Sequence, residues 1–489
     1  MNFRMILSLL GYVLLIIGVA LLLPCIVALC YGESALALLA TIGICAVVGV
    51  GLILLKPKRN RVMHAREGFV MVSLAWIVIS LVGALPFYFS GAIPSYLDAV
   101  FETVSGFTTT GASILTAPEA MPHCLLFWRS FTHWLGGMGV LVFMLAVVPL
   151  SGDSIYLLRA ESPGPSVSKM VPKMRTSAMI LYEIYFVITL LQILAYRLGV
   201  WFGWGEISFF DSLCLAFGTA GTGGFSLSSA GLAAYSTYEQ AVTTVFMLMC
   251  GVNFSIYFFL IRRKFKLIWK NSELRAYLAI VFSAVALITA DLMLKGGYFT
   301  GLRDAIHHVF FSVSSVITTT GFGTADFALW PEFSKAILLG LMIIGGCAGS
   351  TGGGMKVSRV MILIKSARSS IRHMLHPHSV EVITMDGKRI DRDVIDGSFA
   401  FLAVYVLVAL FSMVLLSLDN LGTETTVSSV MATLNNIGPG VSLLVGPYGS
   451  YSVFSGLSKV VMIADMLFGR LELFPMIMLL RPATWRKHG

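Results

Sequence analysis

The segment Ile317-Thr318-Thr319-Thr320-Gly321-Phe322 is small, polar and glycine-ended, and it lies between two long apolar stretches. Three further segments have the same character and setting: Phe107-Thr108-Thr109-Thr110-Gly111, Ala220-Gly221-Thr222-Gly223-Gly224-Phe225 and Leu434-Asn435-Asn436-Ile437-Gly438. Irregular backbone at membrane depth persists only where it is buried in protein or lines a water-filled path, because its N–H and C=O groups find no partners in lipid. Four such segments in one chain therefore indicate four quarters of one ring.

Composition places the chain among membrane proteins. Of its 489 residues, 57% are hydrophobic and 12% are charged, whereas soluble domains carry about 25% charged residues. The formal net charge is +9, and the excess Lys and Arg lie in loops, as the positive-inside rule requires. Because no nucleic-acid-binding motif accompanies them, this charge does not indicate a nucleic-acid partner. Seven scattered cysteines without a CxxC pair indicate neither a disulfide framework nor a zinc site.

Hydropathy predicts an all-α polytopic membrane protein with ten spans, because runs of about 20 apolar residues cross a bilayer. The runs lie near 5–30, 36–55, 69–91, 124–150, 178–202, 239–262, 275–296, 335–364, 397–418 and 453–481. Shorter helical stretches near 96–108, 208–220, 303–318 and 424–435 each end at a glycine segment. The order span, short helix, glycine segment, span thus occurs four times after two leading spans.

This pattern predicts four tandem span–pore-helix–span repeats around one pore. The expected divisions are two leading spans (1–64) and repeats at 65–157, 158–270, 271–372, with a broken second span, and 373–489. Threading ten spans puts the basic loops on one side of the membrane, so both termini are expected in the cytoplasm.

The second segment has two possible registers. Asp98 is 13 residues before Gly111 and Asp211 is 13 before Gly224, which favours Gly224 as the match. The Thr222-Gly223 pair favours Gly223 instead.

The segments have the chemistry of a cation filter. Backbone carbonyls replace the hydration shell of K⁺ in channel filters, and glycine permits the positive φ that such backbone often needs. The partly negative C-terminal ends of the short helices would favour a cation at the ring. Simple Gly/Thr turns are the alternative, which four equivalently placed copies disfavour. The candidate ligands are Thr109, Thr110, Gly111, Thr222, Gly223, Gly224, Thr319, Thr320, Gly321, Asn436, Ile437 and Gly438.

A glycine run interrupts the apolar stretch near 335–364. Six glycines between Gly345 and Gly354 break a helix. Gly349 and Gly354 have the GxxxxG spacing of a phosphate-binding loop, but Met355 stands where that loop needs Lys, and no strand precedes it. The run therefore does not indicate a nucleotide site.

Arg470 lies within the last predicted span, where a charge is costly unless it faces a cavity or a partner. Asp465 and Glu472 are not three or four residues away, so a local ion pair on one helix face is not expected.

Two other charged positions allow several interpretations. Arg129 and His133 are four residues apart and could share a helix face as a proton relay, but a snorkelling Arg and a packed His are favoured. Glu102, in the first short helix, could attract cations at the pore mouth or accept hydrogen bonds, and the sequence leaves both open.

The chain resembles the membrane subunit of bacterial Trk-type potassium uptake systems, in the Trk/Ktr/HKT superfamily, over essentially its whole length. Besides the glycine segments, the resemblance is carried by Arg66-Glu67-Gly68-Phe69, Gly83-Ala84-Leu85-Pro86-Phe87, the run Gly345 to Gly354, and Met466-Leu467-Phe468-Gly469-Arg470-Leu471-Glu472. None of the four segments has the full TVGYG of a potassium channel.

The resemblance implies four repeats around one K⁺ path, with filter glycines at Gly111, Gly224, Gly321 and Gly438. It places Arg470 in the pore under the filter and makes the glycine run an intramembrane gate. The gating residues so implied are Gly345, Gly346, Gly349, Gly352, Gly353, Gly354, Lys356 and Arg470. It further implies a homodimer in the bacterial inner membrane and a separate, cytosolic, TrkA-like ring of Rossmann-like subunits that bind NAD or ATP.

The expected function is potassium uptake across the inner membrane through the four-repeat filter. The alternative is an H⁺- or Na⁺-coupled K⁺ symporter of the same fold. An enzyme is not expected, since the spans contain no Ser/His/Asp set, no HExxH and no paired carboxylates at catalytic spacing.

Overall fold

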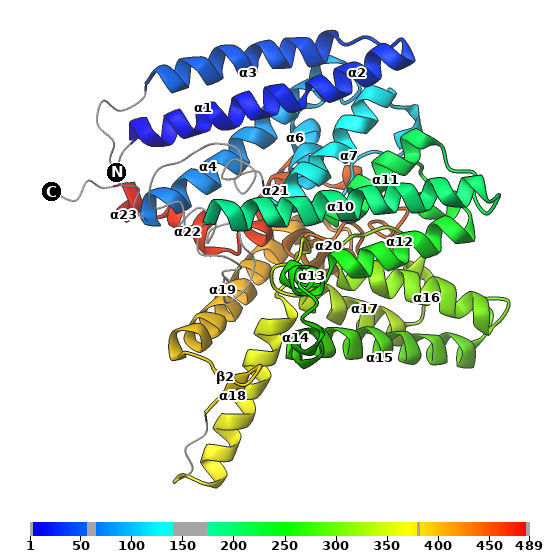
Figure 1. The fold of residues 1–489 in the computed structure, drawn as a ribbon, viewed down its shortest axis with the longest axis vertical. Coiled ribbons are helices and arrows are strands. Elements are labelled where there is room, and N and C mark those ends of the chain that lie inside the picture. Colours follow the sequence, from blue (N-terminus) through cyan, green and yellow to red (C-terminus); the bar gives the residue numbers. More distant parts are fainter. Residues whose placement is uncertain (1–2, 56–64, 140–173, 379–381, 486–489) are drawn as a thin grey trace.

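The computed structural model describes residues 3–55, 65–139, 174–378 and 382–485, which are predominantly α-helical (Figure 1). Within these residues six helical stretches are long and apolar enough to cross a membrane, or seven if the bent pair Thr237–Cys250 and Phe254–Ile261 forms one span. The six are Phe3–Tyr31, Leu36–Leu54, Arg66–Phe89, Ala178–Trp201, Ser272–Lys295 and Arg392–Asp419.

The leading part is a hairpin of α1 (Phe3–Ala20), α2 (Leu22–Tyr31) and α3 (Leu36–Leu54), which packs on one side of the body (Figure 1). A Cβ atom added to Gly11 of α1 would lie 2.6 Å from the carbonyl oxygen of Gly49 in α3. The absence of a side chain at Gly11 therefore allows the two helices to approach closely.

The rest of the chain repeats an order of three helices four times. Each triplet consists of a long first helix, a short helix and a second helix. The long first helices are α4 (Ala65–Gly83, continued by α5, Leu85–Phe89), α10 (Met174–Trp201), α15 (Ser272–Lys295) and α19 (Arg392–Leu416). The short helices are α6 (Tyr96–Phe107), α11 (Phe209–Gly221), α16 (Leu302–Ile317) and α20 (Thr423–Leu434). The helices after them are α7 (His123–Gly137), α12 (Thr237–Cys250), α17 (Glu332–Ile344) and α21 (Gly456–Arg470).

Two short helices begin with the same cap. Ser95 accepts a hydrogen bond from the backbone N–H of Asp98, and Ser208 accepts one from that of Asp211. Serine is a favoured N-cap, and an acidic residue in the first turn complements the helix dipole. The two aspartates that aligned the sequence segments are thus equivalent residues of two helix starts.

Contacts between neighbouring triplets close a circle. α7 packs against α11, α12 against α16, α17 against α20, and α21 returns to pack against α6. The four short helices consequently surround a common centre, with their C-terminal ends near it.

Two of the predicted second spans, 239–262 and 453–481, are interrupted rather than continuous helices. α12 is followed by α13 (Phe254–Ile261) at a bend of 93°. α21 gives way to α22 (Phe474–Leu480) through Glu472 and Leu473, which both have left-handed φ angles. In the stretch near 335–364, residues 345–356 separate α17 from α18 (Val357–Leu375). The end of the predicted span 124–150 lies outside the described residues.

Hydrogen bonds explain the break after α12. The carbonyl oxygen of Gly251 accepts a bond from the Cys347 N–H (2.9 Å), and the Phe254 N–H donates to the Gly349 oxygen (3.0 Å). The Asn253 side chain caps α13 by accepting from the Ser255 N–H. Backbone groups released by the break are therefore satisfied by the glycine run of the next repeat.

The remaining elements lie at the ends of the broken helices. They are α14 (Phe265–Lys270), the two-stranded hairpin of β1 (Thr384–Met385) and β2 (Lys388–Arg389), and α23 (Pro482–Trp485). The far end of α18 and the hairpin project away from the helical body (Figure 1).

Glu33 fastens the leading hairpin to α7. α7 has no side-chain cap from its own N-cap residue, Pro122. Instead the Glu33 carboxylate accepts the backbone N–H groups of His123 (2.7 Å) and Cys124 (2.8 Å). Burial raises the pKa of Glu33, but these hydrogen bonds outweigh it and hold the pKa below its ordinary value.

We predict that Glu33→Ala lowers the midpoint of thermal unfolding in detergent, because a lost helix cap costs about 1 kcal/mol. Since the folded pKa is depressed, the stabilisation is present above the ordinary glutamate pKa of about 4.3 and is lost as the pH falls through the lowered value. The difference between the two chains should therefore narrow on acidification. Glu206→Ala removes an exposed acidic side chain and serves as the control. Equal midpoints at neutral pH would contradict the capping role.

Candidate ion-binding site

The four short helices end in the same backbone structure. Thr109, Thr222, Thr319 and Asn436 follow their ends with left-handed φ angles of 55°, 55°, 59° and 54°. The N–H of the next residue donates to the carbonyl five residues earlier, at 2.8 Å in every case. These bonds are Thr110 to Ser105, Gly223 to Gly218, Thr320 to Ser315 and Ile437 to Ala432. This is the Schellman arrangement, in which glycine usually takes the left-handed position.

The backbone angles also settle the register of the second segment. A second left-handed residue follows two positions later at Gly111 (82°), Gly224 (74°) and Gly321 (92°). Gly224, rather than Gly223, is therefore the equivalent of Gly111. Among the described residues the fourth segment differs, because Gly438 lacks a left-handed φ.

Each segment touches the next at its glycine. A Cβ atom added to Gly111 would overlap the carbonyl oxygen of Gly223, and one added to Gly224 would overlap that of Thr320. A Cβ on Gly321 would lie 3.0 Å from the Gly438 nitrogen, and one on Gly438 would lie 2.7 Å from the Gly111 carbonyl carbon. The four segments thus meet in a closed ring, in chain order, at a distance that leaves no room for side chains.

A polar cavity adjoins the ring. It is lined by Gly111, Gly224, Gly321 and Gly438, together with Arg129 and Tyr451. All four glycines that the sequence picks out therefore share one cavity.

The glycine run, residues 345–356 between α17 and α18, contacts the ring. The Gly353 N–H donates to the Thr319 hydroxyl (2.6 Å), and the Gly354 N–H donates to the Asn435 carbonyl (3.1 Å). A Cβ on Gly353 would overlap the Asn435 oxygen, so this approach requires glycine. Lys356 is buried and donates to the Gly352 carbonyl within the same run.

The other glycines of the run shape its backbone. Gly345, Gly349 and Gly354 have left-handed φ angles. A Cβ on Gly346 would lie 3.1 Å from the Gly251 oxygen, and one on Gly352 would lie 2.7 Å from the Thr318 oxygen. The run therefore fits between the break after α12 and the third segment.

Arg470 joins the ring to the glycine run. Its guanidinium donates to the Thr109 hydroxyl (3.1 Å), the Thr351 carbonyl (2.9 Å), the Gly137 carbonyl (2.7 Å) and the Gly136 carbonyl. These oxygens come from the first segment, the run and the end of α7.

The acidic residues near Arg470 in sequence have partners on other elements. Asp465 accepts a hydrogen bond from Ser412 (2.7 Å), and Glu472 forms an ion pair with Arg359 of α18.

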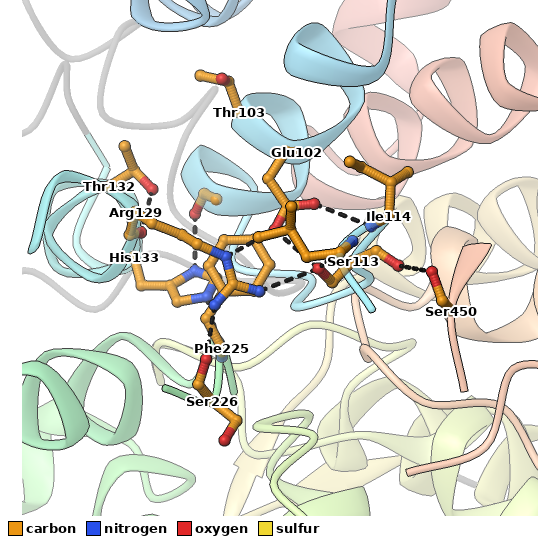
Figure 2. Close-up of polar contacts among 12 residues, drawn as sticks. Glu102, Thr103, Ser113, Ile114, Arg129, Thr132, His133, Phe225, Ser226 and Ser450 are labelled. Carbon is orange, nitrogen blue, oxygen red and sulfur yellow. Dashed lines mark hydrogen bonds and ion pairs between the residues drawn. The ribbon is translucent and has the colours of Figure 1, made fainter. Parts of the chain in front are cut away.

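Glu102, Arg129 and His133 form a buried cluster between the first and second segments (Figure 2). Glu102 is 1% exposed and Arg129 is 2% exposed, and their side chains form an ion pair at 2.6 Å. The snorkelling expected for Arg129 is therefore wrong, and of the two roles left open for Glu102 the structure supports the hydrogen-bond acceptor. His133 is packed, as favoured, with Nδ1 2.8 Å from the Gly106 oxygen and Nε2 accepting from the Phe225 N–H.

Glu273 is a residue that sequence reasoning missed. It is buried at the start of α15, and its carboxylate accepts the backbone N–H groups of Ala348 (2.7 Å) and Ser358 (3.2 Å). It thereby anchors the glycine run at Ala348 and the start of α18 at Ser358. The available sequence signal was an acidic residue at the start of an apolar span. Acidic side chains are rarely buried without partners, so a residue in this place indicates a polar contact.

Comparison with known proteins shows what this chain is similar to. A family model described as "TrkH: Cation transport protein" matches residues 35–487. The chain is 35% identical to the Trk system potassium uptake protein TrkH of Escherichia coli (strain K12), with 100% of both chains covered. It is 30% identical to the Trk system potassium uptake protein TrkG of the same organism, with 99% of each covered.

A solved structure agrees with these relatives. The crystal structure of the potassium transporter TrkH from Vibrio parahaemolyticus matches with a TM-score of 0.88 and 32% identity, covering 99% of this chain and 100% of that one. The chain therefore belongs to the TrkH family of cation transport proteins.

Proposed function

We propose that this chain is the membrane subunit of a Trk-type potassium uptake system, and that K⁺ crosses the bacterial inner membrane through the ring of four glycine segments. The observation that carries the proposal is the closed contact of four equivalent helix ends, each with the same left-handed turn. Two leading spans and four pore repeats, with both termini in the cytoplasm, complete the proposed arrangement. The names of the relatives, all potassium uptake proteins, support transport rather than an enzymatic reaction.

The ring has suitable chemistry for a dehydrated cation. The last carbonyls of a helix have no intrahelical donor and carry partial negative charge, and four such ends converge here. The proposed ligands are the backbone oxygens of residues 109–111, 222–224, 319–321 and 436–438, which would replace the hydration shell. K⁺ is cargo in this proposal rather than a resident cofactor.

The glycine run and Arg470 form the proposed gate. Both bond to the ring through threonine hydroxyls, at Thr319 and Thr109. Arg470 also bonds to the run at Thr351, so the two parts hold each other closed. A fixed positive charge under the ring opposes a cation, and opening requires these bonds to break. The glycine run has few side chains of its own to pack, which lowers the free-energy cost of such a movement.

The names of the relatives also bear on partner proteins. "Trk system" in the names of the relatives indicates a multi-component assembly. We include in the proposal a homodimer and a cytosolic Rossmann-like subunit that binds NAD or ATP and controls the gate.

Purified chain in liposomes should take up ⁸⁶Rb⁺, and K⁺ should compete far better than Na⁺. Uptake that stops at the Nernst potential with or without a pH gradient would support an uncoupled pore. Accumulation beyond that potential, driven by a H⁺ or Na⁺ gradient, would contradict it in favour of a symporter. No uptake, or equal competition by Na⁺, would contradict the filter or its selectivity.

Gly224→Ala should reduce ⁸⁶Rb⁺ uptake by about tenfold or more. The new Cβ would overlap the Thr320 oxygen, and a left-handed non-glycine residue costs of order 1–3 kcal/mol. Gly340→Ala is the control, because a Cβ there meets no atom within 4 Å and alanine favours a helix. Normal uptake by folded Gly224→Ala protein would count against a tightly closed ring.

Arg470→Ala should raise ⁸⁶Rb⁺ flux by about tenfold. Hydrogen bonds from a charged donor contribute about 1.5–3 kcal/mol each, so their loss shifts the gate towards open. Arg481→Ala, near the chain end, controls for the general loss of a positive charge, and thermal midpoints verify folding. Flux equal to that of the unchanged chain would refute the gating role.

A further inference from the structure

We infer that the buried pair of Glu102 and Arg129 positions the second glycine segment against the first, and thereby sets the preference of the ring for K⁺ over Na⁺. This inference rests on the proposed function. It assigns a role in selectivity to two side chains outside the ring and outside the gate.

The pair spans the two segments at matching positions (Figure 2). The Glu102 carboxylate accepts from Arg129 Nε (2.6 Å), the Ser113 hydroxyl (2.9 Å) and the Ile114 N–H (3.0 Å). Arg129 also donates to the Ser226 carbonyl (2.7 Å) and to the Ser113 hydroxyl (3.1 Å). Ser113 and Ser226 each lie two residues after the ring glycine of their segment. One ion pair therefore fixes both strands just beyond the ring.

Further contacts from side chains of α7 hold the second segment in place. The Arg129 guanidinium lies 3.6 Å from the centroid of the Phe225 ring. The Phe225 N–H donates to His133 Nε2, whose ring contacts the Gly106 oxygen through Nδ1. Since Nε2 accepts, Nδ1 must carry the proton and donate. Side chains of α7 thus hold residues 225 and 226 by a backbone N–H, a carbonyl and an aromatic face.

The other junctions between neighbouring triplets are built differently. At all three, the side chain of the fourth residue of the second helix contacts a side chain on the short helix of the next triplet. These contacts are Gln240–His307 (2.7 Å), Lys335–Glu424 (2.8 Å) and Lys459–Asp98 (2.6 Å). At the first junction this position is Leu126, which is apolar and buried.

Arg129 replaces the missing contact at a greater depth. It lies three residues after Leu126 on α7, nearly one helical turn nearer the ring. The residues at the same position of the other second helices are Thr243, Leu338 and Met462. Among these four equivalent positions the charged residue is Arg129, and its ion pair with Glu102 lies beside the cavity that adjoins the ring.

Two physical effects connect the pair to selectivity. A ring that discriminates K⁺ from the smaller Na⁺ must keep the number and spacing of its oxygens, and a loosened second segment would let them close on Na⁺. Arg129 also lines the cavity beside Gly111 and Gly224. Without Glu102, its charge would repel cations there. Breaking a buried pair costs about 3–5 kcal/mol, whereas replacing both partners is better tolerated.

The test measures ⁸⁶Rb⁺ uptake by the full chain in liposomes, with K⁺ and Na⁺ as competitors. Glu102→Gln and Arg129→Gln should each lower the ratio of K⁺ to Na⁺ competition at least tenfold, and the double variant should recover part of it. Arg129→Lys keeps the charge but loses the fork that reaches Ser226, so a smaller loss is expected. Lys335→Gln, at the third junction, is the matched control and should keep the ratio of the unchanged chain.

The outcomes separate the two proposals. An unchanged ratio in folded Arg129→Lys and double-variant protein overturns the positioning role and leaves the proposed function standing. An unchanged chain that takes up no ⁸⁶Rb⁺ overturns the proposed function, and the inference with it. If a single variant does not give a monodisperse protein with a measurable thermal midpoint, Arg129→Lys and the double variant decide. An equal fall of the ratio in Lys335→Gln also overturns the role, because any loosened junction would then suffice.

Discussion

The structure depends on one constraint: backbone N–H and C=O groups inside an apolar surrounding need partners. Four helices end at the centre of this chain, and each end leaves carbonyls without intrahelical donors. The repeated bond from the residue after the left-handed turn, such as Thr110 to Ser105, satisfies one of these carbonyls. The turn reverses the chain direction and brings the next glycine against its neighbour. The breaks in α12 and α17 follow the same rule, because their released groups bond to each other.

The left-handed position is held by threonine in three segments and by Asn436 in the fourth, although glycine adopts this φ most readily. A β-branched residue with this φ is strained, and glycine would relieve the strain. Side-chain bonds hold the turns in place: Thr108 to Thr110 and Thr318 to Thr320, both at 2.8 Å. In return, the hydroxyls of Thr109 and Thr319 accept the bonds from Arg470 and Gly353. Strain at these sites is therefore coupled to contact with the proposed gate, which is where strained backbone tends to be found.

Sequence reasoning predicted the features that neighbouring residues determine, such as the positions of the short helices. The predicted helix at 208–220 is α11 (Phe209–Gly221), and the two aspartates aligned the segments because both follow a serine cap. It missed what depends on distant partners. The bend after α12 lies at Gly251-Val252-Asn253, inside a longer apolar stretch, and is stabilised by the long-range Phe254–Gly349 hydrogen bond. The local sign of it was Asn253, which caps α13. Arg129 was expected at the membrane surface because its partner, Glu102, is 27 residues away on another helix.

The ring is held from two sides by unequal parts. On the gate side, Arg470 bonds to the first segment, and the glycine run bonds to the third and fourth through Thr319 and Asn435. The second segment receives its side-chain contacts from α7, through Arg129 and His133. In the proposed gate, the contacts of the first, third and fourth segments with Arg470 and the glycine run would have to change, whereas the contacts of the second segment with Arg129 and His133 would not.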